Sequence, residues 1–241
     1  MRIIENVKIA LDTYKMVLQP TGPKSKKLKT LVPGQFINIK IEGFYLRRPI
    51  SIADWNDESL TIIYKVVGKG TKALSEMEQG IKLDILWPLG NGYNLTWIPH
   101  SAILIGGGVG VPPMYGLAKK LVEEGKKPRI ILGFREKNQV FYDNEFRKLG
   151  LEVTVYTEDG SYGEKGFVTD GFNQAEYVCA CGPERMLEAI YHKAQDGQYS
   201  FEARMACGFG GCMGCSCETL VGNKRICKEG PVLIHKELLW M

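Results

Sequence analysis

Histidine, on which much hydrolytic and metal chemistry depends, is scarce in this sequence. The 241 residues include only three histidines, His100, His192 and His235. There is no G-x-S-x-G nucleophile motif and no H-E-x-x-H zinc motif. The sequence therefore does not indicate a serine hydrolase or a zinc protease, and chemistry supplied by a cofactor is the better expectation.

A strong excess of one charge is also lacking. Lysine and arginine number 31 against 27 aspartate and glutamate residues, which gives a formal net charge of +4. The most basic stretch is Lys24–Lys29, in a segment bounded by prolines, and no aromatic residues are interleaved with its lysines. We expect a solvated loop there, and a nucleic-acid partner is not indicated.

The sequence lacks an uninterrupted apolar segment long enough to cross a membrane. An uncharged stretch of 18 residues, Ser101–Ala118, approaches the required length. Five glycines and the adjacent Pro112 and Pro113 interrupt it, which indicates a strand, a turn and a helix instead. The chain also starts without a secretory signal, so we expect a cytoplasmic protein that does not associate with membranes.

Three segments with different patterns follow one another. Residues 1–99 carry short runs rich in aliphatic and aromatic residues, which predict strands at 2–11, 14–18, 35–41, 49–53, 60–67 and 82–86. One helix is predicted among them, at Thr71–Gln79, ending before Gly80. Regular short strands are typical of a small antiparallel β-barrel.

Residues 100–198 alternate between strand and helix patterns. The predicted strands are 102–105, 129–134, 152–157 and 177–180, and the predicted helices are 112–124, 144–149 and 184–194. This alternation predicts a Rossmann-like parallel sheet with helices on its faces. Residues 199–241 hold a cysteine-rich loop and a tail. The fold class is therefore multidomain β plus α/β, with a small C-terminal domain.

Four of the seven cysteines have an informative spacing. Cys207, Cys212 and Cys215 form the pattern C-x4-C-x2-C, and Cys227 follows after eleven residues. This is the plant-type spacing in which four thiolates hold a [2Fe–2S] cluster. The intervening glycines permit positive φ angles and allow backbone N–H groups to approach the sulfur atoms.

Two other interpretations of these cysteines remain open. A structural zinc site usually takes two C-x2-C pairs, and only Cys212 and Cys215, or Cys215 with Cys217, provide anything similar. Unliganded thiols are the second alternative, whereas a disulfide framework fits poorly with an odd number of cysteines. The iron–sulfur interpretation is favoured; the roles of Cys217 and Cys179 are not defined.

Two glycine-containing turns predict a dinucleotide site. The first predicted parallel strand runs directly into Gly106, Gly107, Gly108, Val109 and Gly110 before a helix, and a later strand ends at Cys181-Gly182-Pro183. Glycines at a helix N-terminus let backbone N–H groups approach a pyrophosphate. The first run is not G-x-G-x-x-G, so a merely tight turn is the alternative. Both turns follow parallel strands, however, and therefore meet at one sheet edge.

The first segment carries candidate flavin motifs. Within Arg48-Pro49-Ile50-Ser51, the arginine suits a phosphate and the serine hydroxyl suits the flavin ring. Gly70 and Thr71 open the predicted helix, where free N–H groups suit a pyrophosphate. Each feature taken alone is equally compatible with an ordinary surface arginine or a plain helix cap.

The motifs in this order resemble the ferredoxin–NADP reductase superfamily. With the C-terminal cysteine loop added, nearly the whole chain resembles the electron-transfer subunits of class 1B, NAD-dependent dihydroorotate dehydrogenases. The resemblance implies that an FMN-containing partner subunit oxidises dihydroorotate. Electrons would then pass through [2Fe–2S] and FAD to NAD⁺, in a heterotetramer with two copies of each subunit.

The resemblance also implies site residues. FAD would contact Arg48, Pro49, Ile50, Ser51, Ile63, Tyr64 and Lys65, with Gly70 and Thr71 at its pyrophosphate; NAD would meet the two glycine-containing turns; and Cys207, Cys212, Cys215 and Cys227 would hold the cluster. No obligatory acid or base is identified, and Ser51 and Cys181 are the candidates nearest the flavin and nicotinamide.

Two alternatives to this function stay open. One is a reductase subunit of a hydrogenase or ferredoxin:NAD(P) oxidoreductase complex, and the other is a redox-sensing module that turns nothing over. The preference between NAD and NADP is also open from the residues, because Arg135 suits a 2′-phosphate whereas Glu136 suits a ribose hydroxyl.

Overall fold

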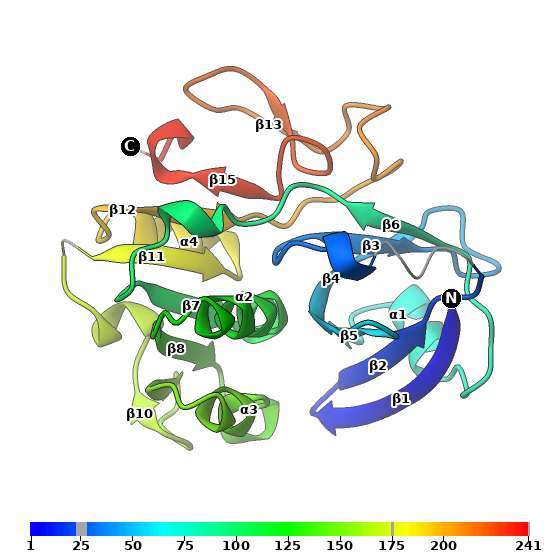
Figure 1. Ribbon diagram of the computed structural model, residues 1–241, viewed down its shortest axis with the longest axis horizontal. Helices are drawn as coiled ribbons and strands as arrows, with labels where there is room; N and C mark the ends of the chain where they lie inside the picture. Colours follow the sequence, from blue (N-terminus) through cyan, green and yellow to red (C-terminus); the bar gives the residue numbers. More distant parts are fainter. Residues whose placement is uncertain (23–27, 175, 241) are drawn as a thin grey trace.

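The computed structural model describes residues 1–22, 28–174 and 176–240, in two large sheets and one small one. The two large sheets stand side by side, and the C-terminal segment lies across one end of both (Figure 1). Most of the predicted basic loop, including Lys24, Lys26 and Lys27, falls outside the described residues. In the part of the chain that is described, no helix is long and apolar enough to span a membrane.

The first sheet is antiparallel and has the order β1-β2-β5-β4-β3-β6. Its strands are β1 (Arg2–Ala10), β2 (Thr13–Gln19), β3 (Phe36–Ile39), β4 (Arg48–Trp55), β5 (Leu60–Lys65) and β6 (Ile85–Leu89). Backbone hydrogen bonds join the start of β1 to residues 80–83, which lead into β6. The two edges of the sheet therefore meet, as expected of a barrel, around a core that includes Ile37, Ile39 and Ile62.

One strand and one helix of this segment differ from their predicted ranges. The strand predicted at 82–86 is instead β6, because residues 80–83 bond to β1 and the pairing with β3 begins at Ile85 and extends to Leu89. The helix predicted at Thr71–Gln79 is α1 (Lys69–Ser75). It ends early: Met77 N donates to Leu74 O in a tighter turn, and the Asn6 side chain donates to the carbonyl oxygens of Leu74 and Met77 beyond the helix.

The second sheet has the order β10-β9-β8-β7-β11-β12-β15 and is parallel except for β15. The strands are β7 (Ile103–Gly107), β8 (Arg129–Phe134), β9 (Val153–Thr157), β10 (Glu164–Lys165), β11 (Tyr177–Cys181), β12 (Asp196–Ser200) and β15 (Val232–Ile234). All three helices predicted here are present within a few residues of their expected limits, as α2 (Val111–Glu123), α3 (Asp143–Lys148) and α4 (Glu184–Tyr191).

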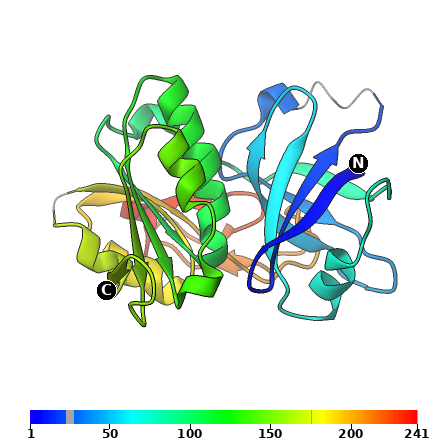
Figure 2. The same ribbon diagram turned by 90° about the horizontal axis from the view of Figure 1, so that it is seen from below.

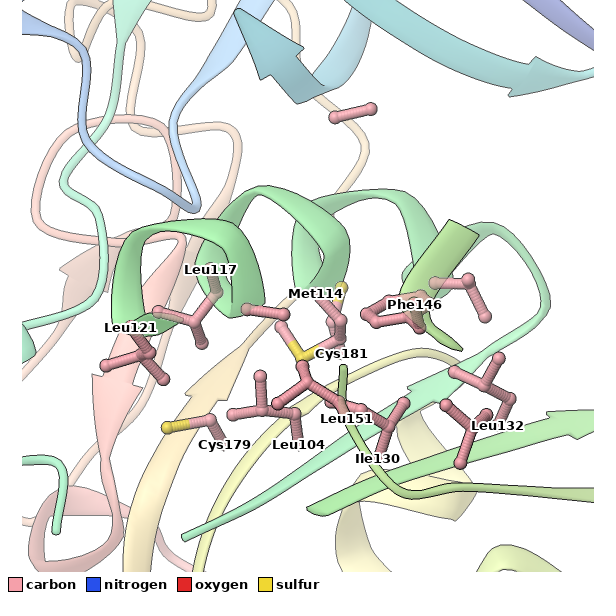
Figure 3. Packing of buried hydrophobic residues seen from close by; sticks show 14 of the residues in the cluster. Leu104, Met114, Leu117, Leu121, Ile130, Leu132, Phe146, Leu151, Cys179 and Cys181 are labelled. Carbon is pink, nitrogen blue, oxygen red and sulfur yellow. The ribbon is translucent and has the colours of Figure 1, made fainter. Parts of the chain in front are cut away.

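Alternate residues of the central strands pack on opposite faces of this sheet. Leu104 and Ile130 contact one face of the core together with Met114, Leu117 and Leu121 of α2 (Figure 3). On the other face the core contains residues 103, 105 and 178 with Leu187 and Ile190 of α4. Both faces are thus covered by helices, as a parallel sheet requires.

Helix α2 also fixes the parallel sheet against the barrel (Figure 2). A Cβ atom on Gly116 would lie 2.8 Å from the carbonyl oxygen of Ala53 in β4, so the helix and strand are in close contact. Lys119 Nζ lies 2.8 Å from Asp54 Oδ1 beside this contact. The two cofactor regions predicted from the sequence are therefore held next to each other.

The C-terminal segment is more closely joined to the parallel sheet than the sequence indicates. It contains the short hairpin β13 (Ser216–Cys217) and β14 (Lys224–Arg225). It then returns as β15, antiparallel to β12. Neither β12 nor β15 is predicted, because β12 has the mostly polar sequence Asp-Gly-Gln-Tyr-Ser and β15 is only three residues long. The boundary expected between residues 198 and 199 falls inside β12.

Candidate cofactor sites

The cysteine loop folds with backbone N–H groups directed at sulfur. Gly211 N lies 3.2 Å from Cys207 Sγ, and Cys227 N lies 3.4 Å from Cys215 Sγ. Gly208 and Gly210 have φ angles of +75° and +90°, which L-residues with a Cβ rarely adopt. The positive φ angles and N–H···S contacts expected from the glycine content are therefore present. Cys207 is half-buried, Cys212 exposed, and both Cys215 and Cys227 buried.

The four thiols associate as two pairs. Burial would raise the pKa of the Cys207 thiol, but hydrogen bonds from the backbone of Phe209 and Cys212 and from the Cys212 thiol outweigh it, and the pKa falls to about 6. In the second pair, burial and then the hydrogen bond with Cys215 raise the pKa of Cys227 to about 12.

This arrangement is compatible with the cluster that the cysteine spacing predicts. Over the described ranges, no group of three Cys, His, Asp or Glu side chains is already placed to hold a metal ion. Two thiol pairs, one at Cys207 and Cys212 and the other at Cys215 and Cys227, match the four thiolates that hold two irons in a [2Fe–2S] cluster.

Two further cysteines lie outside these pairs. Cys179 is fully buried in β11 beneath α2 (Figure 3). Cys217 is half-buried in β13 and pairs across the hairpin with Lys224. Burial raises the pKa of both thiols. Neither cysteine belongs to the predicted C-x4-C-x2-C…C ligand spacing.

The barrel sheet opens where the flavin residues were predicted. Strands β4 and β5 pair only through Ile52–Trp55 and Leu60–Ile62. On the open side of this ladder, residues 48–51 of β4 pair with β3 instead, and residues 63–65 of β5 pair with β2. Backbone groups on the facing sides of these two stretches can thus bind a planar ring inserted between them.

A phosphate-binding arrangement lies at the end of this opening. The Arg48 guanidinium packs over the Phe44 ring, 5.1 Å from its centroid, and against Gly70 in the first turn of α1. A Cβ atom on Gly70 would lie 2.4 Å from Arg48 Nε, so only glycine admits this contact. Arginine and a helix N-terminus together suit a pyrophosphate.

Thr71 takes a different role from the one expected of a free hydroxyl. Its Oγ1 accepts hydrogen bonds from Val67 N at 2.9 Å and Gly68 N at 3.3 Å, and donates to Gly68 O. Thr71 therefore shapes the loop before α1. Since the hydroxyl is already bonded within the protein, the pyrophosphate contact predicted for Thr71 would be made by its backbone.

The three residues predicted on β5 have different surroundings. Ile63 is buried among side chains of the interface with α2, and Lys65 is half-buried. Tyr64 lies in the barrel core, where its hydroxyl donates to Asn6 Oδ1 at 2.9 Å. Burial raises the pKa of Tyr64 well above its usual range. The side chain of Tyr64 thus faces away from the opening.

Ser51 is available for a ligand. It is half-buried at the end of the open stretch of β4, and its hydroxyl has no hydrogen-bond partner among residues 1–22, 28–174 and 176–240. Ile50 beside it is also half-buried and packs at the margin of the barrel core. Both positions are compatible with the flavin contacts predicted for them.

The two glycine-containing turns meet, as predicted from their strands. A Cβ atom on Gly110 would lie 2.1 Å from Cys181 O, and one on Gly182 would lie 3.2 Å from Gly107 Cα. A Cβ atom on Gly106 would likewise lie too close to the backbone of Val111. These glycines are needed for packing, whereas Gly108, with φ +51°, has nothing within 4 Å of its Cβ position. Gly108 is therefore the residue of this turn that faces open space.

Both turns adjoin the opening in the barrel. The 3-10 turn Gly108–Gly110 contacts β5. The geometry consequently brings the predicted nucleotide site and the predicted flavin site together, with Pro183 exposed at the rim and Cys181 buried behind it. Burial raises the pKa of the Cys181 thiol to about 12, so this group is a neutral thiol at physiological pH.

One residue of the site has no counterpart in the sequence prediction. Asn38 in β3 is 1% exposed, and its Nδ2 donates to Cys207 O at 3.3 Å. The available signal was a single polar residue inside the buried run Phe-Ile-Asn-Ile, Phe36–Ile39. A buried polar side chain needs a partner, and here the partner is 169 residues away in sequence.

Comparisons with known proteins agree with this geometry. Family models match residues 202–239, as the "iron-sulfur cluster binding domain of dihydroorotate dehydrogenase B", and residues 104–192, as an "oxidoreductase NAD-binding domain". The electron transfer subunit of dihydroorotate dehydrogenase B (NAD(+)) from Fusobacterium nucleatum is 44% identical, covering 97% of this chain and 95% of that protein. The subunit of the same name from Shouchella clausii is 39% identical, covering 95% and 93%. The chain belongs to this family.

A solved structure extends the comparison to the fold. NADH-dependent reduced ferredoxin–NADP oxidoreductase, determined in a study of flavin-based electron bifurcation, superposes with a TM-score of 0.87 at 30% identity. The match covers 99% of this chain and 89% of that one. The expected fold class, a ferredoxin–NADP reductase-like protein with a C-terminal iron–sulfur domain, is confirmed.

Proposed function

We propose that this chain carries electrons from a catalytic partner subunit to NAD⁺. The partner is an FMN-containing subunit that oxidises dihydroorotate, two copies of each chain forming the complex, and the reaction serves pyrimidine biosynthesis. The observation that carries the proposal is the adjacency of three sites: the paired cysteines, the opening between β4 and β5, and the two glycine-containing turns. Membership of the dihydroorotate dehydrogenase B family supports the choice of partner.

Three groups of residues are proposed to bind the three cofactors. In the proposal, FAD is held by Arg48, Pro49, Ile50, Ser51, Ile63, Tyr64, Lys65, Gly70 and Thr71; NAD by Gly106, Gly107, Gly108, Gly110, Cys181, Gly182 and Pro183; and [2Fe–2S] by Cys207, Cys212, Cys215 and Cys227. When bound, the cluster supplies single-electron transfer, and FAD supplies the exchange between single electrons and the electron pair of a hydride.

The protein's own part is to position and shield. Arg48 neutralises phosphate charge at the N-terminus of α1. Ser51 offers a free hydroxyl at the flavin edge. Gly108 allows a close approach of the nucleotide, and α2 holds that turn against β5. The Cys181 thiol does not act as a base in the hydride step, because burial raises its pKa to about 12 and keeps it neutral.

A second function is favoured by one observation. The structural match to NADH-dependent reduced ferredoxin–NADP oxidoreductase covers 99% of this chain. A reductase subunit of such a complex would have the same three sites and a different electron donor. The higher identity to the dihydroorotate dehydrogenase B subunit, 44% against 30%, favours the first proposal.

Anaerobic spectroscopy of the purified chain tests the carriers. We expect a flavin band overlaid by the broad absorbance of a [2Fe–2S] cluster, and bleaching of the flavin when NADH is added. A colourless protein, or a flavin that NADH does not reduce, would contradict the proposal. The partner is tested separately, by adding a dihydroorotate-oxidising FMN subunit or a ferredoxin and measuring which one supports NAD⁺ reduction.

A further inference from the structure

Asn38 joins the flavin strands to the cluster loop through one side chain. It lies in β3, where it is paired with Pro49 of β4, within the candidate flavin motif. Its side chain points out of the barrel to the cysteine loop, where Nδ2 donates to the carbonyl oxygen of Cys207 at 3.3 Å. Gly208 packs against the same amide, since a Cβ there would lie 2.3 Å from Nδ2.

Of the two polar atoms in the Asn38 side chain, Nδ2 has a hydrogen-bond partner and Oδ1 has none. Within the described part of the chain, Asn38 Oδ1 is the buried side-chain oxygen or nitrogen that lacks a hydrogen-bond partner. Exchanging the amide oxygen and nitrogen would not help, because Oδ1 would then face the Cys207 carbonyl oxygen. The orientation of the amide is therefore set by the cluster loop.

Stability alone does not explain an asparagine at this position. An apolar residue of similar shape would remove the unpaired Oδ1, at the cost of the one hydrogen bond to Cys207 O. An unsatisfied buried group of this kind points to a role other than stability.

We infer that Asn38 is a positioning residue that fixes Cys207, and with it the first iron ligand, against the strands of the flavin site. This inference rests on the proposed function of both sites. Groups outside the ligand set commonly orient metal ligands and tune the metal, here through the backbone of Cys207. Loss of the hydrogen bond leaves Gly208, with its φ of +75°, free to move away from β3.

Two substitutions of similar size separate this role from folding. Asn38→Asp keeps Oδ1 and removes the donor, whereas Asn38→Leu removes both polar atoms. We expect both variants to release iron to a chelator about tenfold faster than the wild type, which corresponds to about 1.4 kcal/mol. Both should also shift the g-values of the electron paramagnetic resonance spectrum of the dithionite-reduced cluster.

Thermal unfolding distinguishes the two variants from each other. Asn38→Leu should unfold close to the wild-type temperature, because the loss of the unpaired Oδ1 offsets the loss of the donor to Cys207 O, while still losing iron faster. Asn91→Leu is the matched control. Asn91 Nδ2 also reaches from the barrel to a backbone carbonyl, that of Glu229 at 3.2 Å, but not to a cysteine. Its iron-release rate should stay within twofold of the wild type.

The outcomes are distinct. If both Asn38 variants keep the wild-type rate of iron release and the wild-type spectrum, the inference is overturned while the proposed function stands. Loss of the cluster from a variant with unchanged circular dichroism supports the inference. Absence of the cluster from the wild-type chain itself overturns the proposed function and the inference with it.

Discussion

At the scale of single residues, the cysteines separate into proposed ligands and bystanders by their spacing and their partners. Cys212 is exposed and its thiol bonds to Cys207, whereas Cys217 lies in the hairpin strand β13, outside both thiol pairs. Cys212→Ser should abolish the iron–sulfur absorbance and electron flow from the partner, because serine is a poor ligand for this cluster. Reduction of FAD by NADH should remain within twofold, measured by stopped-flow absorbance.

Cys217→Ser is the control for this substitution. It should keep the cluster spectrum, since Cys217 belongs to neither thiol pair. Loss of NADH-dependent flavin reduction in folded Cys212→Ser would contradict the proposed order of carriers, and loss of the cluster in Cys217→Ser would contradict the ligand assignment.

The glycines of the nucleotide turn also separate into two kinds. Gly110→Ala forces a Cβ to within 2.1 Å of the Cys181 carbonyl oxygen, and backbone atoms cannot rotate away. We expect it to lower the free energy of unfolding by about 1–3 kcal/mol, as overpacking does. Gly108→Ala meets open space and should cost only about 1 kcal/mol for its left-handed backbone.

Urea unfolding of the two glycine variants measures this difference. The larger loss of stability should be that of Gly110→Ala, with the slope of the transition unchanged. Equal losses would show that the two turns are not in the close contact described above. Gly108→Ala should instead be recognised by weaker NADH binding, since its Cβ would point into the proposed nucleotide site.

Sequence spacing predicted these residues to different extents. The four proposed ligands are close in sequence, so their spacing alone carries the information. Tyr64 was assigned to the flavin by its position in a motif, but the alternation of the strand turns its side chain into the barrel core. Asn38 could not be found, because its contact with Cys207 depends on tertiary packing.

At the scale of elements, the opening between β4 and β5 is the proposed binding site of the flavin. Arg48 lies at one end of it, over Gly70 of α1, while the adjacent Arg47 is paired with Asp84 at 2.8 Å. Arg48→Ala should raise the dissociation constant for FAD about tenfold to a hundredfold, the effect of losing a charge-assisted hydrogen bond. Arg47→Ala should change it less than threefold, since its partner is Asp84.

Fluorescence titration of the apo-flavoprotein with FAD measures both constants. Similar losses of affinity in the two arginine variants would contradict the assignment of the phosphate site. The salt dependence offers a further check, because an arginine–phosphate contact weakens as ionic strength rises.

The elements themselves were predictable where a local pattern determines them. The strands β7, β8, β9 and β11 and the helix α2 match the expected ranges closely, because each has strong periodicity and a clear turn on either side. α1 was predicted too long because the carbonyl oxygens of Leu74 and Met77 bond to the side chain of Asn6, 68 and 71 residues away, a contact that the local pattern does not contain. β12 and β15 were missed because pairing with their neighbours creates them.

At the scale of the whole molecule, the C-terminal tail joins the cluster domain to the parallel sheet. β15 pairs with β12, and the following His235 stacks on Tyr191 of α4 with ring centroids 4.2 Å apart. The Tyr199 hydroxyl lies 3.1 Å from His235 Nδ1, and Trp240 packs edge-on to Tyr191 and Tyr199. A group of aromatic side chains, which includes the imidazole of His235, thus holds the iron–sulfur domain against the parallel sheet.

Protonation of His235 should loosen this attachment. Burial, helped by Lys236 and opposed by Asp196, holds the pKa of His235 below its usual value of 6.5. The unfolded chain therefore binds a proton more readily at this position than the folded one. The contribution of His235 to the free energy of unfolding is fully present above pH 6.5. It falls as the pH drops through 6.5 towards the folded pKa and levels off below it. The titration of this one group cannot change the free energy of unfolding by more than about 1.4 kcal/mol per pH unit.

His235→Phe isolates this contribution, because phenylalanine keeps the stacking on Tyr191 and cannot be protonated. Thermal unfolding followed by circular dichroism at pH 7.5 and 5.5 should show a smaller loss of stability on acidification in the variant than in the wild type. The variant should be slightly less stable at pH 7.5, since the Tyr199 hydroxyl loses its partner. If both proteins lose the same stability between the two pH values, the titration of His235 does not govern how the cluster domain is attached, and carboxylates elsewhere in the chain must account for the loss.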